Sequence, residues 1–180
     1  MKQNVLIAGI GNIFLGDDAF GSMVARRMMD RPHRPEVKIL DFGIRGFDLA
    51  FTLLENYELV VLIDILPHSA LSGSLRVLEL PLSAPSDANR GAPQSHGMTP
   101  VRALELANQF GVNAKHIYLI GCEPENLLPN ESGEFSLTPA VEAAVEPAIL
   151  LVNELVEEFF QKTEQQPRQS RRQGPSVCTS

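Results

Sequence analysis

The stretch NVLIAGIGNIFLGDDAFG, residues 4–21, decides the fold. It starts with a continuous apolar run of strand length, which is typical of a strand buried on both faces of a parallel sheet. After this run, the spacing of the apolar residues changes, and Phe20, Val24 and Met28 lie four residues apart. This spacing predicts an amphipathic helix, capped at its start by Asp17 or Asp18. A buried strand that leads into a helix is the repeating unit of α/β folds.

The rest of the chain continues this alternation of strands and helices. Further strands are predicted at 36–42 (EVKILDF), 57–66 (YELVVLIDIL) and 115–124 (KHIYLIGCEP), with an edge strand within 73–82. Helices are predicted at 44–56, 99–110 and 136–162, and residues 81–97 form a long loop. We therefore expect a three-layer α/β fold, in which helices cover both faces of a mostly parallel, twisted, five-stranded sheet.

Composition and charge narrow the function classes. Residues 1–161 are expected to form a single domain, and residues 162–180 a disordered polar and basic tail. The chain has a net charge of −7, and residues 162–180 carry four basic side chains and one acidic one, which leaves −10 on residues 1–161. An acidic body argues against nucleic acid as a partner. No apolar run approaches a membrane span, and two cysteines fit the reducing cytoplasm.

Acidic residues stand where ligands bind in open α/β sheets, beyond the carboxyl ends of the strands. Asp17 and Asp18 follow the first strand, Asp41 ends the second, and Asp64 lies near the end of VVLIDIL. Asp64 could simply cap a local turn, and one acid of the pair could cap a helix. Two acids at neighbouring strand ends nevertheless point to a cation or to acid–base chemistry.

Among the four histidines, His96 is the best candidate for a third ligand. It lies in the long loop, just before a predicted helix start on the same side of the sheet, whereas His68 lies beyond Pro67. His33 and His116 are expected at the surface. The set Asp18, Asp64 and His96 suits a borderline divalent metal such as Zn, Ni, Mn or Fe, with coordination positions left open. Cys122 is expected to be a small buried hydrophobe.

Two other kinds of site fit parts of this pattern. A dinucleotide site needs a third glycine where this chain has Phe14, and the acid pair would repel a pyrophosphate. A phospho-accepting receiver module would use two acids after the first strand and an Asp after the third, but it also needs a Lys after the last strand. The segment GCEPENLLP supplies no such Lys.

Four motifs in order resemble the endopeptidases that mature the large subunit of [NiFe] hydrogenases. They are GIGNIFLGDDAFG, VVLIDIL, SHGMTP, and GCEPENLLP followed by SLTPAVEAAVEPAI, spanning about residues 4–155. The resemblance implies that Asp18, Asp64 and His96 contact nickel carried by the precursor, after which a short C-terminal peptide is removed. It implies no resident metal, no organic cofactor, a cytoplasmic location and a hydrogenase precursor as partner.

One segment departs from the family pattern. Where many members have D-G-G-T-x-G, this chain has DFGIRG, with Phe42 and Ile44 in place of Gly and Thr. The resemblance places this loop beside the site, so this chain could recognise a different precursor from those of other family members. For the chemistry, Asp18 and Asp64 are the candidate catalytic acids, and the residues leave open whether a metal or a carboxylate activates water. A non-catalytic metal-binding module also stays open.

Overall fold

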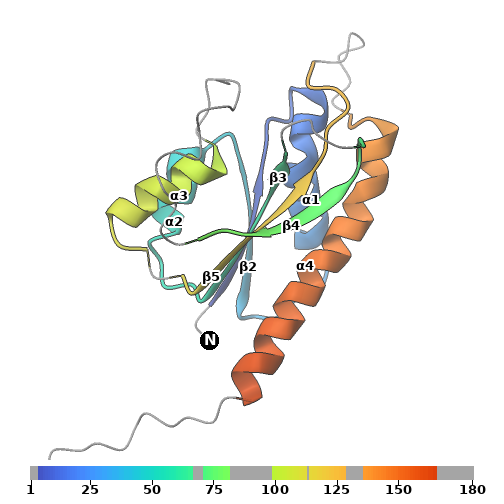
Figure 1. Ribbon diagram of the computed structural model, residues 1–180. Helices are drawn as coiled ribbons and strands as arrows, with labels where there is room; N and C mark the ends of the chain where they lie inside the picture. The colour runs from blue at the N-terminus through green and yellow to red at the C-terminus, as the bar shows by residue number, and fades with distance from the viewer. Residues whose placement is uncertain (1–3, 67–70, 82–98, 113, 129–135, 166–180) are drawn as a thin grey trace, which may run out of the picture.

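The computed structural model of the protein describes residues 4–66, 71–81, 99–112, 114–128 and 136–165. Figure 1 shows a central sheet with helices on both faces, as predicted. The strands are β1 (Val5–Ile10), β2 (Val37–Gly43), β3 (Leu59–Ile65), β4 (Leu75–Glu79) and β5 (His116–Cys122). A 3-10 helix, η1 (Gly16–Ala19), precedes α1 (Phe20–Met29), and the other helices are α2 (Gly46–Thr52), α3 (Pro100–Gln109) and α4 (Pro139–Gln165).

The strand order β2-β1-β3-β5-β4 fixes where a ligand can bind. All pairs are parallel except β4 with β5, so the edge strand predicted within residues 73–82 is confirmed and is antiparallel. From β1 the chain passes to β2 on one side and then to β3 on the other. The carboxyl ends of β1 and β3 therefore form the switch point of the sheet, where α/β proteins bind ligands.

Side chains of β1 alternate between two hydrophobic cores. Val5 and Ile7 face the layer formed by α1 and α4, whereas Leu6 and Ala8 face α2 and α3. Each large apolar side chain buried in this way contributes roughly 1.5–3 kcal/mol. The alternation explains why the strand reads as one continuous apolar run, since both of its faces are covered.

The glycines after β1 allow α1 to lie directly on the sheet. A Cβ atom at Gly21 would overlap the carbonyl oxygens of Ile10 and Ile63, and a Cβ atom at Gly9 would overlap Gly21 and Ala25. The first turn of α1 therefore packs backbone against backbone over β1 and β3. These glycines serve the close packing of α1 on the sheet.

The first two predicted helices differ from the observed ones. Asp17 and Asp18 lie in the short η1, and no side chain caps η1 or α1, so the predicted cap is wrong. The second helix, expected over 44–56, stops at Thr52. Buried Leu53 and Tyr57 then bring the chain back into the core before β3.

Helix α3 begins at its predicted start, whereas α4, predicted from residue 136, begins at Pro139. Thr99 caps α3 by accepting a hydrogen bond from the Arg102 N–H, with Pro100 in the first turn. Helix α4 runs through Pro147 and ends at Gln165, four residues beyond the predicted domain boundary at 161. In the described part of the chain, neither α4 nor any other helix has the apolar length needed to cross a bilayer.

Candidate functional site

The turn after β1 holds Asp18 by a backbone hydrogen bond. The Asn12 N–H donates to Oδ2 of Asp18 at 3.0 Å, and the Asn12 side chain accepts from the Phe14 N–H at 3.0 Å. Gly11 has a φ of 138°, and a Cβ atom there would overlap the carbonyl oxygen of Asp18. Asn12 therefore organises the turn. The negative charge held by this turn is the Asp18 carboxylate, which would repel the pyrophosphate of a dinucleotide.

Asp64 lies near the carboxyl end of β3 and is coupled to Asp18. Burial raises the pKa of Asp64 to about 7, and the negative charge of Asp18 contributes to this increase. The Ile65 N–H donates a hydrogen bond to Oδ1 of Asp64 at 2.8 Å, which lowers the pKa in part. Burial also raises the pKa of the Asp18 carboxyl, against the Asn12 hydrogen bond. The structure thus brings two under-solvated carboxyls together at the switch point.

Asp17 has a structural role that the sequence did not reveal. Its fully buried carboxylate accepts hydrogen bonds from the backbone N–H groups of Glu125 and Asn126, at 2.8 and 2.9 Å. It also accepts from the N–H and the hydroxyl of Thr138, at 2.7 and 3.0 Å. Asp17 therefore joins the β1 turn to the loop after β5 and to the start of α4, which Thr138 immediately precedes.

The other candidate residues fall outside the acid pair or outside the described ranges. His96 and His68 lie in segments that are not described. Asp41 pairs with Arg26 at 2.7 Å and accepts from the Gly43 N–H. His33 and His116 are exposed, as predicted.

Two further groups, at the end of β5 and directly after it, are structural. Cys122 is buried and unpaired, and burial raises the pKa of its thiol to about 12, so the prediction of a small buried hydrophobe is confirmed. Glu123 is fully buried and forms an ion pair with Arg76 of β4. The sequence GCEPE does not reveal that Glu123 is buried, because its partner Arg76 lies 47 residues away in the chain.

The acid pair by itself would be an incomplete metal site. Within the described ranges, no three His, Cys, Asp or Glu side chains gather closely enough to hold a metal ion. Two carboxylates leave most positions of a divalent cation open. An ion at this place would need further ligands besides these two carboxylates.

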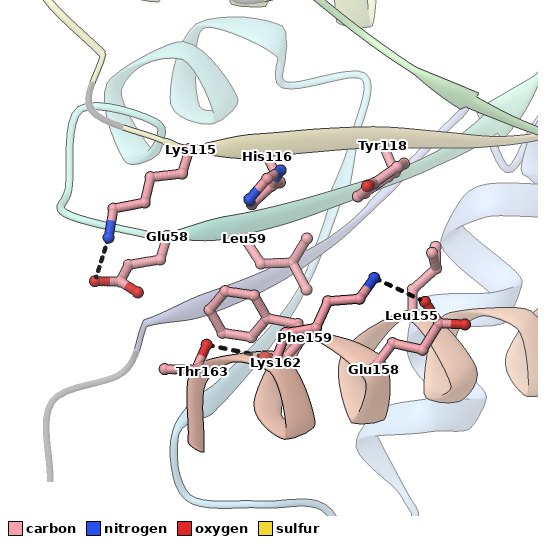
Figure 2. A pocket seen from close by; sticks show the side chains of 10 residues that line it. All are labelled: Glu58, Leu59, Lys115, His116, Tyr118, Leu155, Glu158, Phe159, Lys162 and Thr163. Carbon is pink, nitrogen blue, oxygen red and sulfur yellow. Dashed lines mark hydrogen bonds and ion pairs between the residues drawn. The ribbon is translucent and has the colours of Figure 1, made fainter. Parts of the chain in front are cut away.

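A surface pocket at the opposite end of the sheet is not this site. It has a volume of about 370 Å³ and lies between the starts of β3 and β5 and the last turns of α4 (Figure 2). Its charged side chains neutralise each other: Lys115 pairs with Glu58 at 3.2 Å, and Lys162 pairs with Glu158 at 3.2 Å. The pocket contains neither Asp18 nor Asp64.

Comparison with known proteins identifies the family. The profile of the HycI hydrogenase maturation protease family matches residues 22–155. The chain belongs to the hydrogenase maturation protease family. It is 30% identical over 149 residues to the hydrogenase 2 maturation protease of Escherichia coli K12, an alignment covering 82% of this chain and 87% of that protein.

Solved structures of hydrogenase maturation proteases share the fold. The maturating endopeptidase HybD from E. coli superposes with a TM-score of 0.68 at 26% identity, over 88% of this chain and 93% of that one. The maturation protease HycI from Thermococcus kodakarensis KOD1 gives a TM-score of 0.65 at 25% identity, over 87% and 94%. The resemblance drawn from the four motifs is confirmed, and the protein is a peptidase rather than a receiver module or a non-catalytic metal-binding module.

Proposed function

We propose that this hydrogenase maturation protease removes a short C-terminal peptide from the nickel-loaded precursor of a [NiFe] hydrogenase large subunit in the cytoplasm. The observation that carries the proposal is the Asp18–Asp64 pair, two coupled carboxyls with raised pKa values at the switch point of the sheet. The relative with 30% identity is named a maturation protease of hydrogenase 2.

The charge of the acid pair favours a cation that arrives with the substrate. Two carboxylates held close together repel each other, and a divalent cation between them removes that repulsion. Asp18 and Asp64, with His96 as the third candidate ligand, leave coordination positions that the precursor's own ligands can fill. The nickel is then part of the substrate, and only a loaded precursor presents it to the protease.

Asp64 is suited to handle the proton in amide hydrolysis. A general base works best when its pKa lies near the operating pH, and before a cation binds, burial places the pKa of Asp64 at about 7. Ionised Asp64 can accept a proton from the attacking water and pass it to the leaving amine. Asp18 is fixed by the Asn12 N–H and would offer its carboxylate to the cation.

The loop after β2 is expected to contact the precursor through Ile44 rather than Arg45. The Arg45 guanidinium donates to the carbonyl oxygens of Asp41 and Phe42, the latter at 3.1 Å, and lies 3.5 Å from Asp48. Arg45 therefore braces its own loop. Ile44 is two-thirds exposed, so this apolar side chain is the one available to a partner.

The test is a processing assay with the full-length precursor of the cognate large subunit. Wild-type protein should release one C-terminal peptide only when the precursor carries nickel, as measured by the mass of the large subunit. Asp64→Asn should stop release, whereas the control Asp30→Asn, at an exposed position at the far end of α1, should process at the wild-type rate. Nickel-independent release, or none from the loaded precursor, contradicts the proposal.

A further inference from the structure

The turn after β1 lies directly against the segment after β5. The two segments exchange hydrogen bonds: the Asp17 N–H donates to the Asn126 carbonyl oxygen at 3.0 Å, and the Asn126 N–H donates back to Oδ2 of Asp17 at 2.9 Å. Gly16 comes equally close, since a Cβ atom there would lie 2.9 Å from the same carbonyl oxygen. Asp17 is therefore bound through its backbone as well as through its side chain.

Helix η1 needs this support from outside. It has four residues, Gly16–Ala19, and no side chain caps it. A 3-10 helix has poorer hydrogen-bond geometry than an α-helix, so a single turn does not hold itself in place. Asp18 lies in this turn, and its N–H donates to the Leu15 carbonyl oxygen at 3.0 Å. In the described ranges its carboxylate receives one hydrogen bond, from the Asn12 N–H. The place of the Asp18 carboxylate therefore follows the backbone of η1.

Thr138 joins η1 to α4. A threonine before a helix ordinarily caps it by accepting a backbone N–H, whereas the Thr138 hydroxyl donates to Oδ2 of Asp17 at 3.0 Å. The Thr138 N–H donates to Oδ1 at 2.7 Å, so one residue holds both carboxylate oxygens. Thr138 is itself fixed, because its carbonyl oxygen accepts from the Glu142 N–H at 2.8 Å. Val141 and Val145 of the same helix are fully buried.

Stability alone does not require a charged group at the position of Asp17. A buried carboxylate must be desolvated, and apolar side chains of similar volume often stabilise a core as well or better. A carboxylate with four donors from three residues is restricted to one orientation. Fully satisfied buried networks of this kind make a structure rigid. The network around Asp17 therefore suits a role in geometry, and the residue next to it is Asp18.

We propose that Asp17 and Thr138 are positioning residues, which hold η1 in the place where the Asp18 carboxylate faces Asp64 across the switch point. This inference rests on the proposed function, because the reaction must use that acid pair. Both residues act through the backbone of η1 rather than on the precursor. A displacement of about 1 Å at a reacting group can lower a rate about 100-fold. A small shift of η1 should therefore slow cleavage without unfolding the protein.

Thr138→Val tests this role, because valine keeps the branched shape of threonine and removes the hydroxyl. For the nickel-loaded precursor, kcat should fall by about 10-fold and KM should stay within about threefold of wild type. The reason is that Asp18 still meets the nickel, but out of the reacting geometry. Thr138→Ser keeps the hydroxyl, and its kcat should stay within about twofold of wild type. An unchanged kcat in Thr138→Val, or an equal fall in Thr138→Ser, overturns the inference.

Val152→Ala separates geometry from stability. Val152 is fully buried on α4, and its truncation should lower the midpoint of urea unfolding at least as much as Thr138→Val does. Its kcat should nevertheless match wild type, because the apolar side chain of Val152 forms no hydrogen bond to η1. An equal loss of kcat in Val152→Ala and Thr138→Val would show that the Thr138 hydroxyl contributes stability alone, which overturns the inference.

Hydrogen exchange of the free protein measures how firmly η1 is held, without any precursor. Amide exchange at Asp17 and Asp18, followed by NMR and expressed relative to buried Val61 of β3, should be about 10-fold faster in Thr138→Val. This ratio should keep its wild-type value in Thr138→Ser and in Val152→Ala. An unchanged ratio in Thr138→Val overturns the positioning role even if wild-type protein processes the precursor. Faster exchange in that variant, together with no nickel-dependent release by wild-type protein, contradicts the proposed function alone.

Discussion

Asp17 and Asp18 are adjacent in sequence, yet their surroundings are opposite. The Asp17 carboxylate receives four hydrogen bonds from three distant residues and has no exposed surface. In the part of the chain that the structure describes, the Asp18 carboxylate receives one hydrogen bond, from the Asn12 N–H, and it lies beside the like charge of Asp64. A buried acid whose hydrogen bonds are satisfied stabilises the fold, whereas an acid short of partners is available for a cation.

The largest effect is expected from removing the satisfied acid. Asp17→Ala leaves two loop N–H groups and the Thr138 N–H without their acceptor, so the free energy of unfolding should fall by about 3–5 kcal/mol. Urea unfolding followed by circular dichroism measures this loss. A loss below about 1 kcal/mol would mean that water replaces the carboxylate, and the contrast between the two acids would then fail.

The next effect concerns the packing of α1 beneath the acid pair. Gly21→Ala places a methyl group against the carbonyl oxygens of Ile10 and Ile63. This should lower the unfolding free energy by about 2–3 kcal/mol and reduce processing, because α1 must move away from β3. Gly111→Ala is the control: its φ is 85°, but no atom lies within 4 Å of the added Cβ, so only backbone strain of about 1 kcal/mol applies. Equal losses in the two variants would show that the close approach of α1 has no energetic role.

A third experiment measures, through pH, the cost of burying the Asp64 carboxylate. Its folded pKa of about 7 exceeds the ordinary value of 3.8, so between those pH values the folded protein holds a proton that the unfolded chain releases. The contribution of Asp64 to stability is therefore fully present below about pH 4 and is lost as the pH rises towards 7. Asp64→Asn should be more stable than wild type by about 1–3 kcal/mol at pH 8, and by less at pH 5. Urea unfolding at both pH values checks this, and a difference that does not grow with pH contradicts it.

The smallest effect is expected at the opposite end of the sheet, where charges are already paired and solvated. Lys115→Met breaks the ion pair with Glu58, whose atoms lie 3.2 Å apart. Exposed pairs of this kind contribute less than about 1 kcal/mol. Thermal unfolding should shift by a few degrees at most, and precursor processing should match wild type. A marked loss of processing would move part of the function to the pocket of Figure 2.

The sequence predicted the sheet and the two coupled acids because their signals are local. An apolar run such as VVLIDIL specifies a buried strand by itself, and the position of Asp64 within that run places it at the strand's carboxyl end. The role of Asp17 could not be predicted, since its partners lie 108 to 121 residues away. Local reasoning treated Asp17 as a cap for the helix that follows it, but its carboxylate serves the start of α4 instead.

The long-range bonds of Asp17 also set the order in which the enzyme can become active. A nascent chain can form β1 and its turn early, but the carboxylate finds its Thr138 partners only after residue 138 has been made and α4 docks. Contacts of such high sequence separation form late, because a long loop must close first. A chain still in synthesis therefore lacks the bonds that join the turn after β1 to the start of α4.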